Sequence, residues 1–239
     1  MHFGGDYLVP HLNGATYSHK PPLLFWLINL GWAVFGVNDW WPRMVAPLFG
    51  LATLFATGDL ARRLWPEFGE TVRSTAPLIL LGAFFWTLFT TLTMFDMILA
   101  FCAVVAILGV VIAWQTGRLL GIMLMAIGTG IGILAKGPAI LLHVLPVALS
   151  APYWGATLQG SAHGERPLLQ WYLAMALGLV LALAIGLAWA VPAGMAGGEA
   201  YREAIFWGQS AGRMVDSFAH GRPWWFYLAV IGPMVIPWC

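Results

Sequence analysis

Long apolar runs separated by short polar connections make up most of this chain. A helix of about 20 mostly apolar residues is long enough to cross a bilayer. Six runs approach this length: 44–61, 76–94, 97–114, 119–135, 138–154 and 170–192. A seventh, partial run begins near residue 224. The pattern predicts an all-α fold, a polytopic bundle of membrane helices with juxtamembrane interface helices.

The apolar run 23–37 is shorter than the others. A helix over this run reaches about 22 Å, which falls short of a hydrocarbon core of about 30 Å. Pro21 and Pro22 suit the first turn of a helix, and Asn38 or Asp39 can cap the helix that follows. The run either lies along the membrane surface or crosses it, and its length favours the surface.

Charge placement separates these two topologies. With 23–37 at the surface, one side of the membrane holds Arg62, Arg63, Arg73, Arg118 and Arg166. The other side then holds Lys20, Asp96, Lys136 and the long loop 193–223. If the run spans, Lys20 moves to the arginine side. Because cytoplasmic loops are enriched in basic residues, we expect the arginine side to be cytoplasmic and the short helix to be extracytoplasmic.

Composition agrees with a membrane protein. The chain is 60% hydrophobic and 9% charged, whereas an average soluble domain is about 25% charged. A net charge of +1 gives no basis for nucleic-acid binding. The two cysteines, Cys102 and Cys239, make no disulfide framework.

We expect one transmembrane domain over residues 1–239. Its parts are an extracytoplasmic loop with a juxtamembrane helix (1–41), six transmembrane helices (42–192), an extracytoplasmic loop (193–223) and the start of a further helix (224–239). The first residues lack the regions of a signal peptide, and the last run stops short of a full span. We therefore expect the sequence to be part of a longer protein.

Three ionisable residues border the apolar runs, and each has two interpretations. Lys20 either snorkels to lipid headgroups or holds a phosphate. Asp96 either caps the helix that follows it or belongs to a site, as ionisable residues at membrane boundaries commonly do. Lys136 lies in a tight turn and faces either water or the same site. Their shared side of the membrane favours one site for all three.

The loop 193–223 is the longest polar segment. Its middle, 199–218, predicts an amphipathic helix lying on the membrane, while a solvated loop explains its first charged residues. Arg213 and His220 come close to the membrane and are the better site candidates. Cations gathered on one face suit an anionic lipid headgroup, because arginine and lysine are both good phosphate ligands.

The glycines of GTGIGIL (128–134) allow two interpretations. A nucleotide-binding loop would need a preceding strand, and here the segment lies inside an apolar run. Close packing of helices is the better explanation.

The first loop has a distinctive order of motifs. The stretch GDYLVPHLNGATYSHKPPLLFWL (5–27) runs Gly-Asp-aromatic, a proline, Asn-Gly, then Tyr and Lys-Pro-Pro before an aromatic helix. Related motifs follow in NDWWPRM (38–44), at Asp96, in LAKGP (134–138) and in FWGQSAGRM…HGRPWWFYL (206–228). This pattern resembles the ArnT-like and protein O-mannosyltransferase-related glycosyltransferases, which have the GT-C membrane fold.

The resemblance implies a function. Such enzymes transfer a sugar from a polyprenyl phosphate carrier to a lipid, glycan or protein acceptor, on the extracytoplasmic face of the bacterial inner membrane. It implies a juxtamembrane helix for 23–37 and a role for Asp96 in orienting sugar or acceptor. Substrate- or phosphate-binding roles are implied for Lys20, Lys136, Arg213, Tyr17, His19 and His220. A transporter of an anionic or lipid-linked substrate, or an inactive truncated chain, is the alternative.

Two departures from the family pattern matter. The essential acidic residue of the family lies upstream of the Gly-Asp-aromatic stretch, before Met1, and Asp6 does not replace it. Aminoarabinose transferases carry glutamate immediately before the lysine of Lys-Pro-Pro, where this chain has His19. A divalent metal held by His19 and His220 is the one cofactor that we expect to be compatible with this chain.

Overall fold

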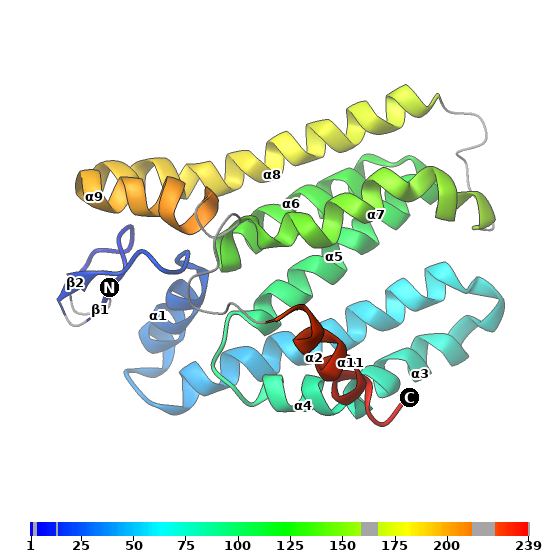
Figure 1. Cartoon of the computed structure of the whole chain (residues 1–239), viewed down its shortest axis with the longest axis horizontal. Helices are drawn as coiled ribbons and strands as arrows, with labels where there is room; N and C mark the ends of the chain where they lie inside the picture. Colours follow the sequence, from blue (N-terminus) through cyan, green and yellow to red (C-terminus); the bar gives the residue numbers. More distant parts are fainter. Residues whose placement is uncertain (2–3, 13, 159–166, 212–222, 239) are drawn as a thin grey trace.

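The computed structural model describes residues 1, 4–12, 14–158, 167–211 and 223–238. These residues are mostly helical, with one small hairpin and short connecting loops (Figure 1). The α-helices are α1 (Leu23–Phe35), α2 (Trp40–Leu64), α3 (Gly69–Gly82), α4 (Phe84–Thr90), α5 (Asp96–Thr116), α6 (Leu119–Lys136), α7 (Leu141–Trp154), α8 (Leu168–Ala196), α9 (Gly198–Glu203) and α11 (Trp224–Val235). A π-helical segment, η5 (Ala204–Ala211), continues α9. Short 3-10 turns are η1 (Pro66–Phe68), η2 (Gly137–Ile140) and η3 (Gly155–Thr157). The hairpin pairs β1 (His11–Leu12) with β2 (Ala15–Thr16) antiparallel, with His11 opposite Thr16.

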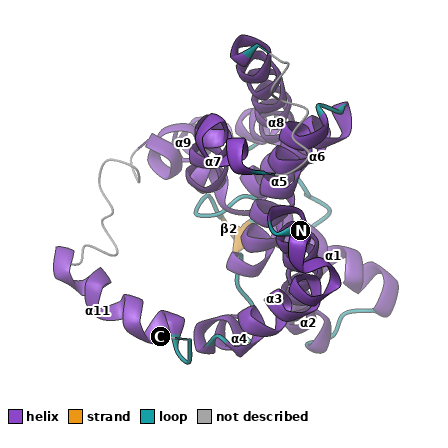
Figure 2. Cartoon of the chain, turned by 90° about the vertical axis from the view of Figure 1, so that its right-hand side faces the viewer, coloured by secondary structure: helices purple, strands orange, loops and turns teal. Residues whose placement is uncertain are grey.

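The long helices form two groups joined by α5. Seen nearly along the helices, α5, α6, α7 and α8 gather on one side and α2, α3 and α4 on the other (Figure 2). Helix α5 packs against both α6 and α2, and most of the buried apolar side chains in the larger core cluster come from α5, α6 and α7. Helices α5 and α6 are therefore the central helices of the fold, and packing on several sides fixes their positions.

Several described segments are long and apolar enough to cross a membrane. Four helical stretches qualify, and a fifth does if a bent pair counts as one span: Trp40–Leu64, Asp96–Thr116, Leu119–Trp154, Leu168–Ala196 and the pair Pro66–Gly82 with Phe84–Thr90. The stretch Leu119–Trp154 is not straight. Gly137 takes a φ of +69°, and Ile140 lies against Gly132 of α6. Helix α7 then runs back in the opposite direction to α6 (Figure 1) and packs against α5.

The expected single helix over 76–94 is wrong. The chain bends by 76° between α3 and α4, at Ala83, which is extended. The C-terminal segment packs at this break: the Trp238 indole donates to the Ile79 carbonyl (2.8 Å), and the Phe84 amide donates to the Ile236 carbonyl (3.1 Å). These bonds satisfy backbone groups that a continuous helix would have paired internally.

The glycines of α6 allow neighbouring helices to approach closely. A side chain on Gly128 would meet the backbone of α5 at Cys102 and Ala106, and one on Gly130 would meet Ile185 of α8. The segment lies inside α6 and is helical throughout, so it does not follow directly after a strand. The expected role in helix packing is confirmed.

Helix α1 turns sharply into α2. Gly36 ends α1 with a φ of +74°, a conformation that glycine adopts without a steric penalty. The Asn38 side chain then accepts a bond from the Trp41 amide (2.8 Å), which is the expected capping of the next helix. The Trp41 indole donates back to the Leu27 carbonyl (3.0 Å), closing the corner.

With 13 residues, α1 is too short to cross a bilayer by itself. It lies with the hairpin and α9 at the left-hand end of the long helices (Figure 1). Leu30, Val34 and Phe35 are exposed on it, which suits a helix whose outer face rests in lipid.

The surface position of α1 can be tested by cysteine labelling. We expect Ser18→Cys and Val37→Cys, which lie on either side of α1, to react with a membrane-impermeant maleimide in intact cells. Val37 is 54% exposed, and its use spares the Asn38 cap. The background chain carries Cys102→Ala and Cys239→Ser.

Glu67→Cys, at the far end of α2, is the control, and it should react only after the membrane is permeabilised. Labelling of Ser18→Cys and Val37→Cys from opposite sides would show that α1 spans.

Candidate active site

An ion pair joins the start of α5 to the end of α6. Lys136 Nζ lies 2.6 Å from Asp96 Oδ1. The two side chains are 30% and 29% exposed, respectively. A partly buried pair is less screened than one in open water, so the attraction between the two charges is stronger than in a fully exposed pair.

Asp96 is the first residue of α5. Phe95 occupies the N-cap position, and no side chain caps this helix end. The interpretation of Asp96 as a simple helix cap is therefore wrong. Its carboxylate is used on Lys136, and the positive end of the helix dipole favours a negative charge in this turn.

Lys136 is the last residue of α6, where a cation is favoured by the negative end of the helix dipole. Gly137 and Pro138 then reverse the chain into η2. The lysine ammonium has three N–H donors, one of which bonds Asp96. The remaining donor directions suit a second anionic or polar group.

The first loop is fastened to the same end of the bundle. Asp6 Oδ1 accepts bonds from the amides of Leu8 (2.9 Å) and Val9 (3.0 Å), which folds the loop locally. The indole of Trp189 in α8 donates to the Leu8 carbonyl (2.9 Å), and Val9 is buried. Asp6 thus has a structural role in folding the first loop.

A chain of aromatic rings brings the stretch around Lys20 to Asp96. The ring of Tyr17 meets that of Phe25 edge-on at 5.7 Å, and Phe25 meets Phe95 in the same way at 5.9 Å. The segment 17–25, which carries Lys20, therefore lies against the residue that precedes Asp96. We call this region, with Lys20, Asp96 and Lys136, the lysine end.

The arginines gather at the opposite end, as the charge pattern predicted. Arg62 and Arg73 both bind Glu70 (2.8 and 3.3 Å), and Arg73 also binds Asp59 (3.0 Å). Arg63 donates to Gln115 (3.4 Å) near the far end of α5 from Asp96. We call Arg62, Arg63, Arg73 and Arg118 the arginine end; Arg166 lies outside the described residues.

Comparison with known proteins identifies the relationship. The model of the family described as dolichyl-phosphate-mannose-protein mannosyltransferase matches residues 19–189, well over half of the chain. The chain belongs to this family. Its match includes Lys20, Asp96 and Lys136, and so contains the whole lysine end.

Two relatives illustrate the similarity of this mannosyltransferase-family chain. It is 31% identical to the undecaprenyl phosphate-alpha-4-amino-4-deoxy-L-arabinose arabinosyl transferase of Pseudomonas paraeruginosa, over 100% of this chain and 42% of the relative. A relative with the same description from Pseudomonas fluorescens Pf0-1 is 29% identical, over 100% of this chain and 41% of the relative. The chain thus spans less than half the length of these proteins.

A solved structure confirms the fold. The crystal structure of ArnT from Cupriavidus metallidurans bound to undecaprenyl phosphate superposes with a TM-score of 0.81 at 23% identity, covering 100% of this chain and 42% of that one. Its apo state gives a TM-score of 0.76. The predicted GT-C-like membrane bundle and the predicted family relationship are both confirmed.

Other predicted site residues have different outcomes. Arg213 and His220 lie outside the described residues. Tyr17 contacts His19 through its ring, at 5.4 Å between centroids, as well as Phe25. Within the described part of the chain, no group of three or more His, Cys, Asp or Glu side chains is arranged to hold a metal ion. The proposed metal site at His19 and His220 stays a prediction, and no step of the reaction is assigned to it.

Tyr201 is a residue whose position the sequence did not indicate. It belongs to the polar segment 193–223, yet it is 2% exposed and packs in a cluster with Val9, Leu134 and Trp189. Burial, and then the charge of Asp6, raise the pKa of Tyr201 to about 12. The signal was the spacing of Tyr201 and Ile205, which puts both on one face of a helix. Of the helix expected over 199–218, the part up to residue 211 is helical, as α9 and η5. Residues 212–218 lie outside the described residues, and the position of this helix on the membrane stays a prediction.

Proposed function

We propose that this chain is the core of a membrane glycosyltransferase that moves a sugar from a polyprenyl phosphate carrier to a lipid, glycan or protein acceptor. The observation that carries the proposal is the Asp96–Lys136 ion pair at the end of the bundle that also holds the Lys-Pro-Pro loop. Family membership supports the reaction class. The site then faces the extracytoplasmic side of the bacterial inner membrane.

The reaction needs an acceptor oxygen to attack the anomeric carbon of the sugar. The bond from that carbon to the carrier phosphate oxygen breaks, and its electron pair leaves with the phosphate. The acceptor loses a proton to a base, which in the family is the acid upstream of residue 5. Negative charge therefore grows on the phosphate as the transition state forms.

Lysines at the site would stabilise this charge where it develops. Lys136 is held by Asp96 with donor capacity to spare. Lys20 belongs to the first loop, and Arg213, which lies outside the described residues, is the third cation that we assign to the same phosphate. Asp96, fixed by Lys136, would accept bonds from hydroxyls of the sugar or acceptor.

The donor to test first is undecaprenyl phosphate-linked 4-amino-4-deoxy-L-arabinose, because the relatives are described by that substrate. Lipid A is the corresponding acceptor to test. His19, in place of the glutamate of the aminoarabinose transferases, is the reason to include other polyprenyl phosphate sugars in the same assay.

The test is sugar transfer in membranes that contain the protein. Membranes are incubated with a carrier whose sugar is radiolabelled, and label in the acceptor is measured against membranes without the protein. We expect label to appear in the acceptor and free carrier phosphate to accumulate in equal amount. Uptake of intact labelled carrier into sealed vesicles without transfer would support a transporter and overturn the proposal.

A further inference from the structure

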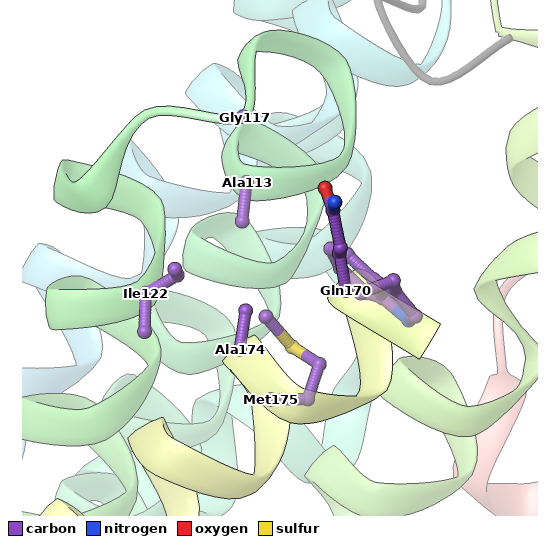
Figure 3. A pocket seen from close by; sticks show the side chains of 7 residues that line it. Ala113, Gly117, Ile122, Gln170, Ala174 and Met175 are labelled. Atoms are coloured by element: carbon purple, nitrogen blue, oxygen red, sulfur yellow. The ribbon is translucent and has the colours of Figure 1, made fainter. Parts of the chain in front are cut away.

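A cavity lies at the arginine end, away from the proposed reaction. Its volume is about 220 Å³, and it is lined by Ala113, Gly117, Ile122, Gln170, Trp171, Ala174 and Met175 (Figure 3). The turn between α5 and α6 forms one wall, and the first turns of α8 form the other. Helix α5 has 21 residues, so about 30 Å of helix separates this wall from Asp96.

The lining decides which chemistry fits inside. Gln170 supplies a side-chain amide at the cavity (Figure 3), and none of the lining residues is charged. The indole of Trp171 already donates to the Ala148 carbonyl (3.1 Å). A phosphate or other charged group would lose its hydration inside without a counter-charge. The interior therefore suits an uncharged segment, such as part of an alkyl chain with uncharged polar groups next to Gln170.

The size of the cavity favours part of a molecule over a whole one. Pockets that enclose drug-sized ligands have volumes of about 300–1,000 Å³. At about 220 Å³, this cavity holds a segment of an alkyl chain whose remainder stays outside. An acyl chain of a bilayer lipid has this form.

The surroundings place the cavity at headgroup depth. Trp114 meets Trp171 edge-on at 5.0 Å and Trp154 at 6.1 Å, so three indoles lie together beside the cavity. Trp114 and Trp171 are buried in the bundle, so the basic residues beside the cavity indicate its depth. The basic residues of the arginine end lie at the same ends of α2, α5 and α6.

The charge next to the cavity favours an anionic headgroup. Arg118 directly follows the lining residue Gly117, which holds the turn with a φ of +59°. Arg118 is exposed, and it joins none of the ion pairs among the described residues, whereas Arg62 and Arg73 are paired with carboxylates.

We propose that the cavity and Arg118 form a binding site for an anionic phospholipid of the bilayer. One acyl chain enters between the α5–α6 turn and α8, and the phosphate contacts the Arg118 guanidinium. The Gln170 amide, on the first turn of α8, bonds polar groups at the lipid's glycerol region. The site is independent of sugar transfer and lies on the other side of the membrane from it.

The proposal is tested by native mass spectrometry of the purified, delipidated protein, with phosphatidylglycerol and phosphatidylcholine added separately. Phosphatidylglycerol should bind more tightly. Arg118→Gln should weaken phosphatidylglycerol binding about fivefold, equivalent to about 1 kcal/mol for one basic side chain at an anionic surface. Arg118→Gln should leave phosphatidylcholine unchanged, and Arg118→Lys should restore most of the difference.

Filling the cavity provides a second, independent variant. Ala174→Phe should reduce binding of both lipids, because its ring occupies the acyl-chain space. Leu173→Phe, at an exposed neighbouring position on α8, and Arg43→Gln, in the first turn of α2, are the matched controls and should bind like the unchanged protein.

Three results would overturn the proposal. The first is equal affinity for the two lipids, and the second is unchanged phosphatidylglycerol binding by Arg118→Gln. The third is a loss of dimers in Ala174→Phe with lipid binding intact, which would identify a second copy of the chain as the occupant.

Discussion

Alanine in place of Lys20 is expected to reduce sugar transfer by at least about 100-fold at equal protein level, since a donor aimed at developing charge contributes about this much or more. The leaving phosphate gains negative charge only as the glycosidic bond breaks, so losing a phosphate ligand lowers kcat more than it weakens donor binding. A lysine that merely reaches toward lipid headgroups would show no such effect. The measurement is transfer of labelled sugar in membranes.

A short series of variants separates charge from shape. Lys20→Met keeps much of the length but loses the charge, and should lose most activity. Lys20→Arg keeps the charge with a different donor geometry, and should retain part of it. Arg43→Ala, which removes an exposed cation from the first turn of α2, should behave like the unchanged protein. Wild-type rates for Lys20→Ala would remove Lys20 from the site.

Breaking the Asp96–Lys136 pair should affect both stability and activity. Asp96→Asn or Lys136→Met leaves the other charge partly buried without its partner, which we expect to cost about 1–3 kcal/mol of unfolding free energy. Each should also lower transfer by at least about 100-fold. The double variant should be less destabilised than the sum of the two singles, with a coupling of about 0.5–3 kcal/mol. Unfolding in detergent and the transfer assay measure the two effects.

The pair at the other end of the bundle is the matched control. Asp59 and Arg73 also lie close (3.0 Å), but they are 43% and 45% exposed, and such pairs contribute about 0–1 kcal/mol. Asp59→Asn should therefore change stability little and transfer not at all. Additive effects of Asp96→Asn and Lys136→Met, with transfer retained, would mean that the 2.6 Å contact does not serve the reaction.

The ends of several elements could be predicted because local signals set them. Pro21 and Pro22 precede α1, and Gly36 follows it, so the expected run 23–37 became a helix over Leu23–Phe35. The turn at Gly137 was likewise foreseen between two apolar runs. The distribution of charges along the sequence also predicted that Asp96 and Lys136 lie on the same side of the membrane, and their contact agrees with this prediction.

Other features depend on contacts that no local pattern contains. At the bend at Ala83, the Ile236 carbonyl and the Trp238 indole form hydrogen bonds with the ends of α4 and α3. Both residues lie more than 150 residues later in the chain. The hydropathy of 76–94 shows that this run is apolar, but it gives no sign of a break at Ala83. The pairing of Asp96 with Lys136, and the burial of Tyr201 against the first loop, likewise require the three-dimensional neighbours to be known.

The glycines of α6 also fix the angular setting of that helix. Gly128 lies against α5 and Gly130 against α8, on nearly opposite sides of α6, and Gly132 lies against Ile140. Turning α6 about its axis would swing neighbouring larger side chains into these close contacts. The direction of Lys136 toward Asp96 is thus set by the close contacts of these glycines, one to two turns earlier in the helix. A methyl group added at one of them would turn Lys136 away from Asp96 without touching either residue.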